Sequence, residues 1–377
     1  MKKTTLRCAI GAVLTVAVSA AFLPSAIGTG ADKKPGKVDN ATVDSFGRLA
    51  EAVLTDRTTA LLDNGSTGRI APKREKKVRL SAELARSEDG ALSSLRTRKS
   101  RLAGLGEAYT SAATQVTADR TSVKGKRVTV EVTETTTLTY KKIRGDEPEN
   151  TGFKARHELT FTASGGKWEL TAIRPMDQGP RPVNAPVTKV AAAPSANSMP
   201  KAKPASISYP GRKPSGKQAT AGNDYKAMAA YAEKYWRNYN PEYQKFNDAG
   251  GDCTNFISQA LKAGGWKNAS GSASDYRAWW YDSSSQSTSW VGANEWSWFT
   301  LNAKRATNLA NVYQMDIGDI MQMDFDGDGS KDHSMITTYR SRAGVPYLTY
   351  HSTNTFRKSV ASIIASNPDA VYYAYRT

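Results

Sequence analysis

The chain has 377 residues, 39% of them hydrophobic and 23% charged, and its 52 Lys and Arg against 35 Asp and Glu give a net charge of +17. This composition is too apolar for a wholly disordered chain, and 29 Gly with only 2 Cys exclude a collagen-like or disulfide-built scaffold. The length allows two domains.

The first thirty residues have the pattern of a secretory signal peptide. Lys2, Lys3 and Arg7 precede an almost wholly apolar run at 8–22, and small residues follow it. The run is shorter than the roughly 20 residues of a typical spanning helix. We therefore expect residues 1–31 to be removed, which would leave a secreted protein, extracellular or attached to the cell wall, without a transmembrane anchor.

Removal of the leader changes the cysteine count. Cys8 lies in the leader, so Cys253 remains as the single cysteine of the mature chain. A lone thiol is exposed to oxidation outside the cell, and its presence there calls for a packing or a chemical explanation.

Residues 32–177 have the pattern of a small α+β domain of unknown role. The periodicity predicts helices at 43–62 and 76–109, followed by strands at 111–120, 127–141, 157–164 and 167–173. Gly165 and Gly166 join the last two strands as a hairpin turn. At the level of fold alone, this region resembles the cone-shaped helix-plus-sheet domains of the nuclear-transport-factor type. We assign His157 no role.

A linker and a neutral second half follow. Residues 178–222 contain 8 Pro, 7 Lys and Arg and no acidic residue, which is typical of an extended tether. Residues 223–377 hold 15 basic and 15 acidic residues, so the whole excess of positive charge lies in residues 1–222. The second half also holds seven of the eight Trp, which favour packing over a ligand surface.

The segment around Cys253 predicts a helix that begins at a candidate nucleophile. Asp252 is a natural N-cap, Phe256 and Ile257 begin a buried stripe, and Gly264 and Gly265 provide the stop. At a helix N-terminus the macrodipole and unpaired amide groups favour the thiolate and can stabilise an oxyanion.

Two histidines of the second half supply the remaining catalytic candidates. His333 opens a β-prone run, and a turn at Gly344 leads into a second run that ends at His351, so we expect neighbouring antiparallel strands. In this arrangement His333 exchanges a proton with Cys253, and His351 orients its ring. Asn354 is the alternative third residue.

These residues resemble the bacterial putative amidase domain family over about 223–377. The matching elements are Asp252-Cys-Thr-Asn-Phe, Gly318-Asp-Ile, Asp332-His-Ser and Tyr350-His-Ser. The family is similar in layout to the papain-like NlpC and CHAP cell-wall hydrolases. The resemblance implies an α+β domain with the cysteine on a helix N-terminus against an antiparallel sheet. It also implies Cys253 as nucleophile, His333 as general base and acid, and His351 as orienting residue, with Asp252 as cap and local orienter.

An acidic loop precedes His333. Asp324, Asp326, Asp328 and Asp332 occupy positions 1, 3, 5 and 9 of a calcium-type loop, but Met335 stands where a bidentate Glu is expected. The pattern leaves a bound Ca²⁺ and a plain Asp/Gly turn both open. No other cofactor is required.

The sequence thus predicts a secreted cysteine hydrolase that cleaves amide bonds, with peptidoglycan as substrate and anionic wall polymers as partners of the basic first half. A non-catalytic wall-binding module and an acyltransferase that uses the same thioester are the alternatives. Nucleic-acid binding is not expected, because no reading element accompanies the charge.

Overall fold

The structure of the protein is a computed structural model that describes residues 38–65, 78–186, 199–209, 222–247 and 251–377. The predicted leader lies outside these ranges, as does part of the predicted linker. Within them, no helix is both long enough and apolar enough to cross a bilayer.

The first half begins with two helices, α1 (Asn40–Thr59) and α2 (Ala82–Gly104), which confirm the two predicted ones. Each begins after a side chain that caps its first turn, Asp39 for α1 and Ser81 for α2. The N-terminal part of the second predicted helix is instead a short strand, β1 (Val78–Leu80).

Four long strands follow: β2 (Tyr109–Lys124), β3 (Arg127–Tyr140), β4 (Asn150–Ser164) and β5 (Lys167–Pro175). Burial alternates along β3, so one face of the sheet packs on the core. The turn between β4 and β5 is confirmed, because Gly165 and Gly166 both have positive φ.

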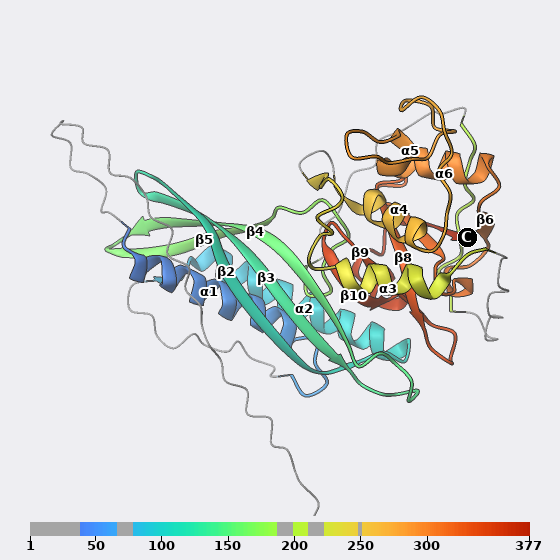
Figure 1. Ribbon diagram of the computed structural model, residues 1–377. Helices are drawn as coiled ribbons and strands as arrows, with labels where there is room; N and C mark the ends of the chain where they lie inside the picture. The colour runs from blue at the N-terminus through green and yellow to red at the C-terminus, as the bar shows by residue number, and fades with distance from the viewer. Residues whose placement is uncertain (1–37, 66–77, 187–198, 210–221, 248–250) are drawn as a thin grey trace, which may run out of the picture. The chain divides into compact units, whose positions relative to one another are not determined.

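The second half packs helices on further strands of mostly antiparallel pairing (Figure 1). Its helices are α3 (Tyr225–Tyr235), α4 (Cys253–Ala263), α5 (Thr288–Val291), α6 (Ala293–Asn302) and α7 (Val360–Ser366), with a 3₁₀ turn η2 (Val312–Gln314). Its strands are β6 (Thr307–Leu309), β7 (Ile320–Asp324), β8 (His333–Arg340), β9 (Pro346–Tyr350), β10 (Asn354–Ser359) and β11 (Val371–Arg376). Of the tryptophans between α4 and β6, Trp279, Trp290 and Trp296 are fully buried.

The two halves share one eleven-stranded sheet. Strand β10 pairs with β4, with Asn354 opposite Lys154, so the sheet runs from β1 of the first half to β6 of the second. One apolar cluster also contains residues of both halves, among them Tyr140 of β3 and Tyr347 of β9. The fold is therefore a mixture of helices and a mostly antiparallel sheet that is continuous between the halves.

The described parts of residues 178–222 do not form a free tether. Val183 and Ala205 are buried in the cluster that the two halves share, and Ser206 forms an isolated bridge with Asn311. The first of these stretches contains a turn closed by the Ala185 N–H and the Pro182 carbonyl, and apolar side chains of both stretches are packed against the core.

Candidate functional site

Cys253 is the first residue of α4, as the sequence predicts. Phe256 and Ile257 on the same helix are fully buried, and the Cys253 side chain is 6% exposed. The hydroxyl of Thr254 lies 2.9 Å from the hydroxyl of Ser334 on β8, so the start of the helix is bound to the start of the strand that carries His333.

The helix N-terminus does not make this thiol acidic in the described conformation. Burial raises the pKa of the Cys253 thiol, and hydrogen bonds from Thr254 and the Ser334 backbone offset only part of that rise. The expected preference for the thiolate is thus reversed, because desolvation of the charged sulfur outweighs the field of one helix end.

His333 is the first residue of β8 and is 1% exposed. Its Nε2 atom is buried and has no hydrogen-bond partner. Burial, together with repulsion from the nearby His351, lowers the pKa of His333 to about 3. The ring is therefore neutral at physiological pH, which is the form that can accept a proton.

Cys253 and His333 are joined through their neighbours. Among the described residues, no hydrogen bond connects the Cys253 sulfur to the His333 ring. The two elements are linked instead by the hydrogen bond between Thr254, which follows Cys253, and Ser334, which follows His333. The buried Nε2 atom of His333 has no hydrogen-bond partner among the described residues.

His351 does not orient the ring of His333. Its Nδ1 lies 2.7 Å from Oδ2 of Asp252, and its Nε2 lies 2.9 Å from the carbonyl oxygen of Tyr235 on α3. A carboxylate oxygen and a carbonyl oxygen thus face the two ring nitrogens of His351. Both nitrogens are used, so the expected bond from His351 to His333 is not formed.

Asp252 stands at the N-cap position but does not cap α4 with its side chain. Its Oδ1 accepts hydrogen bonds from the backbone N–H of Phe246 and from the side chain of Asn255, and its Oδ2 faces His351. The carboxylate is 0% exposed. The capping role was a wrong prediction, and the orienting role is directed at His351.

Asn354 also lies away from His333. Its amide oxygen accepts hydrogen bonds from the Tyr239 hydroxyl and from the backbone N–H of Ser352. The ring of Tyr239 packs 4.1 Å from that of His351, and the ring of Phe256 packs 3.9 Å from it. Asn354 therefore supports the surroundings of His351.

The acidic loop closes on its own backbone. Asp324 accepts N–H groups of Gly327, Asp328 and Gly329, and Asp332 accepts that of Phe325. Carboxylate oxygens of Asp324, Asp326 and Asp332 can all lie within 4.8 Å of one another, a spacing that a cation could bridge.

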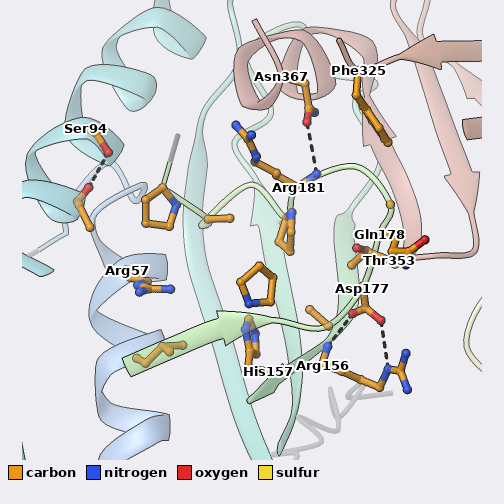
Figure 2. A pocket seen from close by; sticks show the side chains of 18 of the residues that line it. Arg57, Ser94, Arg156, His157, Asp177, Gln178, Arg181, Phe325, Thr353 and Asn367 are labelled. Atoms are coloured by element: carbon orange, nitrogen blue, oxygen red, sulfur yellow. Dashed lines mark hydrogen bonds and ion pairs between the residues drawn. The ribbon is translucent and has the colours of Figure 1, made fainter. Parts of the chain in front are cut away.

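A cavity of about 650 Å³ is lined by residues of both halves (Figure 2). Arg57 and Ser94 line it from the first half, and Phe325 and Asn367 line it from the second. The ring of Phe325, one of the lining residues, lies 6.3 Å from the ring of His333, which does not itself line the cavity.

Sequence reasoning missed several residues that hold this site. The hydroxyls of Thr254 and Ser334 and the aromatic ring of Tyr239 were not assigned a role. Thr254 directly follows Cys253 and Ser334 directly follows His333, and this adjacency could have identified both as site residues. No local pattern indicates Tyr239, because only the tertiary fold brings it to His351.

Comparison with known families bears on the second half. Residues 222–375 match the family described as "Putative amidase domain", which supports activity on amide bonds. This match contains all of the predicted catalytic and supporting residues.

Two proteins of Bacillus subtilis (strain 168) are similar over part of this region. The chain is 37% identical to the uncharacterized protein YhbB over 121 residues, which are 31% of this chain and 38% of that protein. It is 32% identical to the uncharacterized protein YjcM over 148 residues, 36% of this chain and 33% of that protein. The match thus spans 38% of the length of one relative and 33% of the length of the other.

Two solved structures were also matched. They are the intermembrane space region of chloroplast protein ARC6, with 16% identity over 34% of this chain and 95% of that chain, and Kfla4162 from Kribbella flavida, with 13% identity over 35% and 91%. Both have a TM-score of 0.22, which supports no conclusion about the fold.

Proposed function

We propose that the protein is a secreted cysteine hydrolase that cleaves amide bonds of peptidoglycan, with a papain-like arrangement similar to the NlpC and CHAP groups. One observation carries the proposal. Within the segment that matches an amidase domain, a cysteine begins a helix whose next residue is hydrogen-bonded to the strand bearing a neutral histidine with an unpartnered Nε2.

The reaction follows from these groups. The Cys253 thiol gives its proton to Nε2 of His333, and the sulfur attacks the amide carbonyl carbon to form a tetrahedral intermediate. Backbone N–H groups of the first turn of α4 stabilise its oxyanion. The C–N bond breaks as His333 returns the proton to the leaving amine, which leaves a thioester.

Water then completes the cycle. His333 takes a proton from a water molecule, whose oxygen attacks the thioester, and the C–S bond breaks to release a carboxylic acid and the Cys253 thiol. His351 acts on Cys253 indirectly. Its ring holds the side chain of Asp252, the residue that precedes the cysteine.

Burial of Cys253 means that the resting enzyme must open to admit substrate. A thiol that is 6% exposed cannot be reached by a polymer without movement of its surroundings. We propose that wall binding by the basic first half brings the enzyme to its substrate, and that the catalytic half cleaves after this opening.

The test is the release of new amino and carboxyl groups from purified cell wall, followed by mass spectrometry. Wild-type protein should release them, and Cys253→Ala should reduce the rate at least 10³-fold, a rough scale for loss of a nucleophile. Full hydrolysis by Cys253→Ala would refute the cysteine mechanism. Wall binding without any change in the muropeptides would favour the non-catalytic module, and amine-trapped products would favour acyl transfer.

A further inference from the structure

A groove of about 490 Å³ lies beside the candidate site and carries a marked excess of positive charge. Four basic side chains line it, from Lys154, Arg156, Arg237 and Lys245, against a single acidic one, from Asp177. We call these five residues and the space between them the basic groove.

Among the residues that the structure describes, only one of the four cations is neutralised by an ion pair. Arg156 binds Asp177 through its side chain at 3.1 Å and through its backbone N–H, as Figure 2 shows. Within the described ranges, Lys154, Arg237 and Lys245 form no ion pair. Arg237 instead lies over the Trp236 ring and Lys245 over the Tyr239 ring. Three positive charges thus face the groove without a carboxylate.

The groove reaches the residue before the nucleophile. Gly251 and Ser352 also line it, and the Ser352 hydroxyl accepts the backbone N–H of Asp252 at 2.9 Å. Tyr239, another lining residue, packs on His351, the partner of Asp252. A molecule bound in the groove therefore lies next to the segment that presents Cys253.

The pairing of β4 with β10 builds this arrangement. It places Lys154 opposite Asn354, while Arg237 follows α3 and Lys245 precedes α4. Basic residues from three separate parts of the sequence thus place like charges around one space, and a site that gathers unneutralised cations favours an anionic occupant.

We propose that the basic groove binds a carboxylate group of the peptide whose amide bond Cys253 attacks. This inference rests on the proposed function. A space of 490 Å³ accommodates a short peptide segment rather than a polymer, and the amide side chains of Asn238 and Asn247 at its edge can pair with peptide groups. The ammonium and guanidinium groups attract the carboxylate and fix the register of the substrate.

The experiment compares one substrate with and without its charge. Lysozyme-digested muropeptides are used as prepared and after their carboxyl groups have been converted to methylamides with carbodiimide. The variant is the full chain with Arg237→Gln and Lys245→Gln, and the matched control is Lys226→Gln, an exposed lysine of α3 that does not line the groove. KM and kcat are measured at low salt, because screening weakens exposed charges.

For the free muropeptides, we expect the double variant to raise KM about 10-fold, on the scale of two exposed charge contacts, with little change in kcat. For the methylamidated muropeptides, wild-type and variant should have the same, already raised KM. The Lys226→Gln control should match wild type with both substrates.

Equal KM values for wild-type and variant protein with the free muropeptides would overturn the inference. A variant that loses binding only to a polyglycerol-phosphate polymer would overturn it too, in favour of a wall-polymer site.

Binding to the Cys253→Ala chain, measured by calorimetry, separates this inference from the proposed function. If Cys253→Ala binds the muropeptides in a charge-dependent way but the wild type does not hydrolyse them, the proposed function is refuted and the inference about the groove is supported. If hydrolysis depends on Cys253 but not on the substrate carboxylates, the proposed function is supported and the inference about the groove is refuted.

Discussion

At the scale of single residues, the buried pair of His351 and Asp252 is the feature that most alters the expected mechanism. Both groups are nearly inaccessible, and Nδ1 of His351 lies 2.7 Å from Oδ2 of Asp252. Loss of one partner from such a pair leaves an uncompensated buried charge, at a cost of about 3–5 kcal/mol. The pair therefore fixes the start of α4 and, with it, Cys253.

Substitution His351→Gln should lower the free energy of unfolding by a few kcal/mol, in that range, and should also reduce kcat. Urea unfolding and wall hydrolysis measure the two effects. His157→Gln is the matched control, because His157 forms a similar buried pair with Glu134 at 2.9 Å in the first half. It should lower stability and spare kcat; a similar loss of kcat in both variants would show that His351 acts only through global stability.

The neutral state of His333 predicts a pH dependence of stability. Burial lowers its pKa to about 3, below the ordinary 6.5, so between these values the unfolded chain binds a proton that the folded chain does not. Stability should therefore fall as the pH drops through this window, by about 2 kcal/mol at pH 5 from this group. In the His333→Gln variant, the free energy of unfolding should fall less steeply as the pH drops. If the wild-type and variant curves of this free energy against pH were parallel, His333 would not be the group responsible.

At the scale of elements, the acidic loop between β7 and β8 is explained by its own hydrogen bonds. Asp324 binds three backbone N–H groups of the loop, and Met335 occupies the place of a twelfth-position ligand. We expect Ca²⁺ at millimolar concentration to leave the melting temperature and the hydrolysis rate unchanged. A rise of several degrees on addition of Ca²⁺, reversed by a chelator and lost in Asp326→Asn, would establish a calcium loop instead.

Elements that depend on interactions between neighbours in the sequence were predicted, whereas those that depend on residues far apart in the sequence were not. The hairpin at Gly165 depends on local turn chemistry and was predicted correctly, as was the start of α4 at Cys253, although Asp252 does not cap that helix with its side chain. Strand β10 was not predicted, because its pairing with β4 joins residues about 200 positions apart. The partners of His351 were missed for the same reason, since Tyr235 lies 116 residues away from it in sequence.

At the scale of the whole molecule, charge and continuity of the sheet have separate consequences. The excess of positive charge lies in residues 1–222. Binding to purified anionic cell wall should therefore weaken strongly between about 50 mM and 500 mM salt, as the Debye length shrinks. Salt-insensitive binding of the full chain would exclude an electrostatic role for the first half.

Continuity of the sheet predicts that the catalytic half depends on the first half for its stability. Without residues 38–186, β10 loses its partner β4 and becomes an exposed edge, and the buried Tyr347 loses its contact with Tyr140. Fragment 223–377 should therefore aggregate or unfold at a lower urea concentration than the full chain. The matched control is the full chain cut by a protease site placed within 210–221, which keeps both halves and their contacts. A fragment as stable as the cut chain would show that the joined sheet contributes little, and the two halves would then be independent folding units.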